Sequence, residues 1–241
     1  MQVSLVGCVF VLQSEINIDN KKNDIKSLKV IVNKNTKDLI RCEINKENFK
    51  DNIRNKIKFV INSDDFHLEQ VYTMGEKKYF EDNNIDILYM GLTNISNINL
   101  DSDYELLDFS IIDDEKIVFG SSIFNYETIQ TLKANSLEYY HKIDIDNIVL
   151  EKELLELLII YKHLRNRMDN TDVCFKLLSN EFTLEDVRIV YELIKNVKVD
   201  KSNFRKKIIK YCTKVDDVAV GKGYRPSQMY KFNPDSIKKW I

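Results

Sequence analysis

Seven polar and basic residues near the C-terminal end of the sequence have types and spacing that suit the reading of DNA. They are Lys201, Ser202, Asn203, Arg205, Lys206, Lys207 and Lys210, and no acid interrupts them. In the major groove an Asn amide can pair with adenine and an Arg or Lys side chain with guanine, while the remaining cations contact phosphates. A run of cations is more often only the solvated face of a helix, so the elements around this run decide between the two interpretations.

Helical periodicity predicts one helix over 201–211 that turns these groups outward. At about 100° per residue, Phe204, Ile208 and Tyr211 fall on one side, and Ser202, Lys206 and Lys210 fall on the opposite side. A helix packed through its three apolar residues would therefore present a hydroxyl, an amide and cations to a ligand.

A second amphipathic helix is predicted directly before the basic one. Thr183 and Asp186 have the spacing of a capping box. The apolar residues that follow at helical spacing are Leu184, Val187, Tyr191 and Ile194. This pattern alone indicates an ordinary surface helix, but the short turn at 196–200 joins it to the basic helix and favours a helix-turn-helix.

A hairpin with a basic tip is predicted after the two helices. Its strands span 215–220 and 227–232, and Gly221 and Gly223 permit the positive φ values of a tight turn. Lys222, Tyr224 and Arg225 lie at the tip, where a wing can reach phosphates or a minor groove. Residues 169–241 are therefore predicted to form a winged helix-turn-helix domain that binds double-stranded DNA.

The charge of the chain is divided between its two ends. Residues 195–241 hold 13 Lys and Arg against four Asp, a charge of +9, whereas residues 1–194 carry −11. A basic end on an acidic body is typical of a protein that contacts a polyanion through one end only.

Other sequence features exclude several classes of protein. No run of about 18 apolar residues is present, so we expect no membrane partner. Met1–Leu12 has the apolar character of a strand rather than of a signal peptide. The four cysteines, Cys8, Cys42, Cys174 and Cys212, are widely spaced. They predict reduced thiols in a cytoplasmic protein, with no metal site and no cofactor.

The body of the chain, residues 1–168, mixes strands with at least one helix and predicts an α/β or α+β fold. Strands are expected at Ser4–Gln13, Leu28–Val32, Phe66–Met74, Ile85–Ile95, Leu106–Ile112 and Lys116–Phe119, and a helix at Asn45–Asn62. Residues 125–146 fit a helix in part, and Leu137–Ile143 also fits a strand. Glu151–Met168 predicts a connecting helix that is apolar on nearly all sides, so it must lie between the domains, in a dimer interface, or in both.

The C-terminal motifs resemble those of the Nudix-related transcriptional regulators, the NrtR family. The matching residues are Leu164-Arg165-Asn166-Arg167, Thr171-Asp172, Phe175, Leu177-Leu178, Glu181-Phe182-Thr183-Leu184, Val190-Tyr191-Glu192, Asn203-Phe204-Arg205-Lys206-Lys207, Arg225-Pro226 and Tyr230. In the body, the segment His67–Gly75 is similar to one that follows the Nudix helix in these proteins.

The resemblance implies a Nudix-like N-terminal domain that senses a small molecule, often ADP-ribose, and a homodimer that binds an operator. Some members of the family regulate sugar catabolism instead. It places Asn203, Arg205, Lys206 and Lys207 in the recognition helix and Arg225 in the wing. For the small-molecule effector the candidates are Glu69, Gln70 and Tyr72 on one strand, with Lys77 and Lys78 beside it to meet an anion.

The sequence departs from the family pattern where a Nudix hydrolase would bind its metal. Residues 52–61 contain no acid, and Lys56, Phe59 and Val60 stand where carboxylates are expected. The preceding turn, expected at Asp38–Arg41, has no glycine, and residues 76–84 lack the Arg-Gly signature of members that respond to ADP-ribose. We therefore expect no Nudix hydrolase activity.

Three interpretations stay open at this level. The first is a ligand-responsive regulator, most simply a repressor. The second is an enzyme with an accessory winged helix, for which paired acids such as Asp64-Asp65 and Asp113-Asp114 are candidates, whereas His67, His141 and His163 have no nucleophile at motif spacing. The third is a binding module in which the Nudix-like body only mediates dimerisation.

Overall fold

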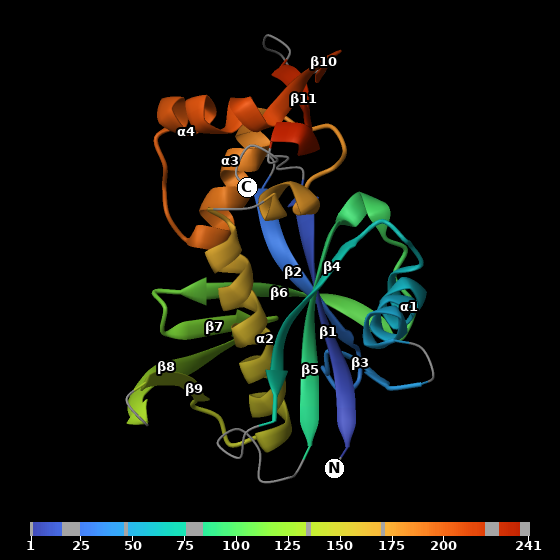
Figure 1. The fold of residues 1–241 in the computed structure, drawn as a ribbon, viewed down its shortest axis with the longest axis vertical. Coiled ribbons are helices and arrows are strands. Elements are labelled where there is room, and N and C mark those ends of the chain that lie inside the picture. The colour runs from blue at the N-terminus through green and yellow to red at the C-terminus, as the bar shows by residue number, and fades with distance from the viewer. Residues whose placement is uncertain are drawn as a thin grey trace.

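A mixed sheet lies between two helices, and a smaller unit of helices and a hairpin covers one end of it (Figure 1). This computed structural model describes residues 2–15, 25–45, 48–75, 84–133, 136–169, 172–219 and 227–236. The strands of the sheet are β1 (Val3–Glu15), β2 (Ile25–Asn33), β3 (Ile40–Glu43), β4 (His67–Met74), β5 (Ile85–Asn94), β6 (Tyr104–Ile112), β7 (Lys116–Phe119), β8 (Ser122–Lys133) and β9 (Ser136–Ile143).

Strand β1 is the centre of this sheet. The strand order is β4-β5-β1-β2-β6-β7-β8-β9, and β3 pairs with the start of β1 beside β2. The β1–β5 pair is parallel and the other pairs are antiparallel. The run of Val, Leu and Phe in β1 is typical of a strand that is covered on both faces, and all residues from Leu5 to Leu12 are buried.

Helix α1 (Phe49–Ile61) covers one face of the sheet. The Asn48 side chain caps it by accepting from Asp51 N, and Asn62 ends it in the left-handed conformation. Its apolar side packs with Leu5, Val9 and other residues of that face. A Cβ at Gly7 would lie 3.0 Å from Ile57 Cδ1, which is tighter than most real Cβ contacts, so the glycine lets Ile57 pack on β1 without shifting.

Helix α2 (Ile148–Arg167) covers the other face. The alternate residues of β1, from Val6 to Leu12, pack with the buried leucines of α2. Phe10, Phe109 and Tyr161 form an aromatic cluster with centroid distances of 5.0–6.1 Å. This helix is buried on most of its circumference, as its sequence predicts, and it also contacts α3.

The smaller unit follows α2 and shares its core. It consists of a short helix η2 (Val173–Leu177), α3 (Leu184–Lys195), α4 (Lys201–Ile208), the single turn η3 (Ile209–Tyr211), and the hairpin of β10 (Cys212–Ala219) and β11 (Ser227–Phe232). One continuous apolar cluster runs from the sheet through α2 to Phe204 and Tyr230. Tyr161 Oη donates to Ile194 O at 2.7 Å, and Asn94 Nδ2 donates to Leu177 O at 3.0 Å, so polar contacts also join the two units.

Two expectations for the body are wrong. Residues 125–146 contain no helix over their described part; they form the β8–β9 hairpin, in which Tyr126 and Ile143 pair and are both buried, and β9 confirms the alternative of a strand at Leu137–Ile143. The turn expected at Asp38–Arg41 is instead the approach to β3, in which Ile40 pairs with Gly7 and is fully buried. The other predicted strands are confirmed to within a few residues. No helix in the described ranges is long and apolar enough to span a membrane.

Candidate nucleic-acid interface

Helix α3 positions the element that follows it. The capping box of Thr183 and Asp186 is confirmed, and Asn196 ends the helix in the left-handed conformation, with a φ of 54°. The buried Glu192 carboxylate then holds the turn to α4: it accepts from Val199 N at 3.0 Å and from Lys198 Nζ at 3.1 Å. Arg188 donates to the same carboxylate. The turn between α3 and α4 is therefore fixed by a side chain.

Helix α4 packs through two residues and leaves the rest of its surface open. Phe204 and Ile208 are buried, and the Phe204 ring lies 5.2 Å from that of Tyr191. The basic and polar residues predicted to contact DNA are exposed: Lys201, Ser202, Asn203, Arg205, Lys206, Lys207 and Lys210. The helix ends at Ile208, so Lys210 lies in the following turn η3.

The exposed cations of α4 differ in what surrounds them. Lys201 Nζ lies 3.4 Å from a Glu185 carboxylate oxygen, and Lys210 Nζ lies 5.0 Å from the centre of the Tyr211 ring. Lys207 acts at longer range, because its charge helps to lower the pKa of Asp169, behind the larger effects of Lys195 and Tyr191. Within the described ranges no carboxylate forms an ion pair with Arg205 or Lys206. These two side chains are therefore available to a polyanion.

The hairpin stands beside α4 at the end of the molecule away from the sheet (Figure 1). Strands β10 and β11 pair antiparallel, and Tyr230 of β11 also bridges to Phe182, just before α3. The hairpin is thus attached to the helices through its second strand. The predicted wing residues Lys222, Tyr224 and Arg225 lie outside the described residues.

Three of the predicted effector contacts, Glu69, Gln70 and Tyr72, lie on β4. The Glu69 carboxylate faces α2: it lies 2.8 Å from His163 Nε2 and accepts from Arg167 Nη1 at 3.1 Å. Burial raises the pKa of Glu69, but the contacts with His163 and His67 outweigh it and lower that pKa. Gln70 and Tyr72 are exposed on β4. Lys77 and Lys78 are not among the described residues.

A second group of charged side chains is buried near the start of α2. Arg41 Nε donates to Glu153 at 3.0 Å and Arg41 Nη2 to Glu156 at 2.5 Å, while Lys152 Nζ lies 2.6 Å from Asp86. Three buried carboxylates therefore face two cations. Burial raises the pKa of Glu156 well above its usual value. The nearby charges of Glu153 and Asp86 also raise this pKa, whereas the charge of Arg41 lowers it.

The sequence did not identify the charged residues that hold α3 to the sheet and fix the turn after it. Lys26, on β2, pairs with Asp186 at the start of α3, and Glu192 closes the α3–α4 turn. The spacing of Arg188 and Glu192 in one helix would have suggested their ion pair. No local pattern could have indicated the Lys26–Asp186 pair, which joins residues 160 positions apart.

Comparisons with known proteins agree with this arrangement. Residues 174–232 match the family described as the NrtR DNA-binding winged helix domain. The sequence matches none of the curated proteins with which it was compared.

Among solved structures, Shewanella oneidensis NrtR in complex with a 27mer DNA is similar to this chain, with 14% identity, coverage of 98% of this chain and 95% of that one, and a TM-score of 0.66. A second structure of Shewanella oneidensis NrtR is 14% identical, covers 98% of this chain and 96% of that one, and has a TM-score of 0.67. A MutT/nudix family protein from Enterococcus faecalis is 15% identical, covers 96% of this chain and 88% of that one, and has a TM-score of 0.64. At these identities the likeness shows a common fold. Residues 174–232 therefore match an NrtR-type DNA-binding winged helix domain, and the chain as a whole has the fold of these NrtR and MutT/nudix structures.

Proposed function

We propose, from this NrtR-like architecture, that the chain is a sequence-specific DNA-binding transcriptional regulator that acts as a repressor. The observation that carries the proposal is the exposed basic face of α4, held on Phe204 and Ile208 with Arg205 and Lys206 open to solvent. Such a face supplies phosphate contacts and donors that can read guanine in the major groove. The Shewanella NrtR complex with DNA supports this assignment at the level of the fold.

The Nudix-like body has a different task in this proposal. It senses a small metabolite, such as ADP-ribose or a sugar or nucleotide derivative, and it does not hydrolyse it. Helix α1 spans the segment where the sequence lacks the metal-binding acids, since residues 52–61 contain no carboxylate. Turnover of nucleotide sugars or dinucleotides by the purified chain, followed by mass spectrometry, would contradict this part.

The chain is divided into two domains and acts as a dimer. The DNA-binding domain is assigned to residues 169–241 and the effector and dimerisation domain to residues 1–168. The active species is a cytoplasmic homodimer, because a palindromic operator needs two recognition helices related by a two-fold axis. Its half-sites should lie about one or two helical turns apart.

The experiment that tests the proposal is selection of binding sites from random DNA, followed by titration of the selected site. We expect a palindromic sequence to be enriched and bound at least about a thousandfold more tightly than unrelated DNA of the same length. Equal affinity for every sequence would contradict specific regulation. Light scattering of the complex gives the number of chains per site, and a single chain would contradict the dimer.

A further inference from the structure

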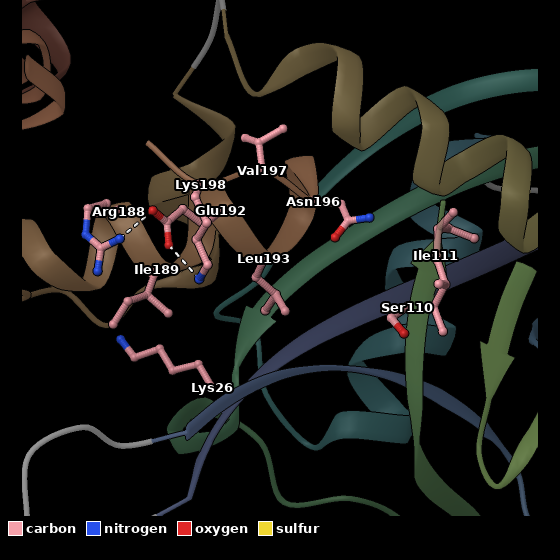
Figure 2. A pocket seen from close by; sticks show the side chains of 11 residues that line it. Lys26, Ser110, Ile111, Arg188, Ile189, Glu192, Leu193, Asn196, Val197 and Lys198 are labelled. Carbon is pink, nitrogen blue, oxygen red and sulfur yellow. Dashed lines mark hydrogen bonds and ion pairs between the residues drawn. The ribbon is translucent and has the colours of Figure 1, made fainter. Parts of the chain in front are cut away.

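A cavity of about 570 Å³ lies between the two units of the molecule, next to the α3–α4 turn. One wall comes from the sheet and the other from the second half of α3 and the residues after it. Its lining residues are Lys26, Ser110, Ile111, Ile112, Arg188, Ile189, Glu192, Leu193, Asn196, Val197 and Lys198. Figure 2 shows Arg188, Glu192 and Lys198 on the α3 side and Lys26 and Ile111 on strands of the sheet. A volume of this size can hold a metabolite.

The walls of the cavity combine apolar and charged side chains. Ile111 is buried, and Ile112 and Val197 are partly exposed, at 38% and 43%. Three of the lining residues are cations and one, Glu192, is an acid. Two of the cations are held in place: Lys26 pairs with Asp186, and Arg188 bonds to both Glu185 and Glu192.

Lys198 is the cation that can change partners. Its side chain is 91% exposed, and its ion pair is with Glu192 at 3.1 Å. Glu192 would keep Arg188 and Val199 N if Lys198 moved away. An anion in the cavity can therefore recruit Lys198 without leaving a buried carboxylate unpaired, whereas loss of Arg188 would be costly.

The same residues form the turn that leads to α4. Lys198 and Val199 both bond to Glu192, and α4 begins two residues later, after its cap Asp200. A ligand that draws Lys198 toward the cavity or displaces Val197 would change the turn between α3 and α4. The opposite wall belongs to β6 and β2, so the ligand would contact both units at once.

We propose that this cavity binds a small amphipathic anion, an organic carboxylate, sulfonate or phosphate with an apolar body. Its charged group is taken by Lys198, and its apolar part lies against Ile112, Leu193 and Val197. Occupancy alters the α3–α4 turn and thereby changes the affinity for DNA. Only this last effect rests on the proposed function; binding of the anion stands independently of it.

The test uses 8-anilinonaphthalene-1-sulfonate as the anionic probe and N-phenyl-1-naphthylamine, which lacks the sulfonate, as its neutral counterpart. Binding of each to the full chain is followed through the methyl NMR signals of Ile112, Leu193 and Val197. We expect saturable shifts of these signals and tighter binding of the anion. Lys198→Ala should weaken binding of the anion by about fivefold and leave the neutral probe unchanged, as for one partly exposed ion pair.

Three further variants check the location. Lys58→Ala is the matched control, because Lys58 is also an exposed, ion-paired lysine but lies on α1; it should bind both probes as the native chain does. Leu193→Trp should fill the cavity and weaken both probes at least about tenfold, and Ile112→Glu, at a more exposed wall position, should weaken the anion if the Trp variant does not fold. The site would be overturned if the probes shifted only methyl signals outside the cavity. It would also be overturned if Lys198→Ala bound the anionic probe as tightly as the native chain does.

DNA affinity is measured separately, with and without the anionic probe. We expect the probe to change the dissociation constant of the selected site by at least about fivefold, the lower end of ordinary allosteric coupling. If the probe bound but the affinity for DNA did not change, the coupling between the cavity and DNA binding would be overturned, whereas the binding site itself would stand. Failure of the free chain to bind any DNA specifically would instead contradict the proposed function, while the probe titration would still decide on the cavity.

Discussion

Glu192 is the single residue on which the geometry of the helix pair depends most. Its side chain is 5% exposed, and it accepts from Arg188, Lys198 and the backbone of Val199. Burial raises its pKa, but these bonds outweigh burial and lower the pKa below its usual value of 4.5. The ionised carboxylate is therefore the form that the folded chain stabilises.

Glu192→Gln should lower the free energy of unfolding by about 1–2 kcal/mol near neutral pH, because the amide keeps an acceptor for Val199 N but loses its charge. A group whose folded pKa is lowered contributes stability above its ordinary pKa and loses it as the pH falls further. The difference from the native chain should thus shrink below about pH 4. Urea unfolding of both chains, near neutral pH and below about pH 4, measures this difference in the free energy of unfolding. Glu181→Gln, in an exposed pair with Lys231, is the control and should cost less than about 1 kcal/mol.

Helix α2 is the element that joins the sheet to the DNA-binding unit. It packs on β4, β5 and β9 and also contacts α3. Its leucines belong to the apolar cluster that continues to Phe204 on α4. The packing that supports α4 therefore reaches back to the middle of the sheet.

Leu158→Ala, at a fully buried position of α2, should lower the free energy of unfolding by about 2–5 kcal/mol. Ile148→Ala, on the same helix but 81% exposed, should change it by less than about 0.5 kcal/mol. Because the core is continuous, near-UV and far-UV circular dichroism should report one shared transition in both variants. Two separate transitions would show that the units unfold independently.

At the scale of the whole molecule, the buried charges near the start of α2 should govern how stability depends on pH. Glu156 faces Arg41, Glu153, Asp86 and Lys152, and Cys8 is also near it. The folded chain raises the pKa of Glu156 above its ordinary value of 4.5, so it holds a proton that the unfolded chain releases. The contribution of this group is therefore most favourable below that ordinary pKa and is lost as the pH rises toward the folded pKa.

Glu156→Gln should remove the loss of stability that the native chain suffers as the pH rises, because the amide resembles the protonated side chain. We expect the variant to gain stability relative to the native chain as the pH rises from about 4.5 toward neutrality. Thermal unfolding across that range measures the two curves. Parallel curves would show that Glu156 is ionised throughout, balanced by Arg41 and Lys152.

The parts of this molecule that could be predicted from the sequence are those set by local physics. The capping box, the apolar stripe of α3 and the acid-free surface of α4 depend on residues within one or two turns of each other. The helix expected in part of residues 125–146 was wrong because the Tyr, Thr and Leu residues there fit helix and strand alike until β7 provides an edge to pair with. The Lys26–Asp186 pair and the interdomain cavity depend on docking of the two units, which no local pattern encodes.

The most direct test of the central claim is the salt dependence of DNA binding by an Arg205→Ala, Lys206→Ala double variant. Both residues are exposed on α4, and Lys50→Ala, exposed at the start of α1, is the matched control. We predict that the double variant binds the selected site at least about tenfold more weakly and that its log–log salt slope falls by about one or two, with the control unchanged. Native affinity and slope in the double variant would contradict the assignment of α4 as the DNA-reading helix.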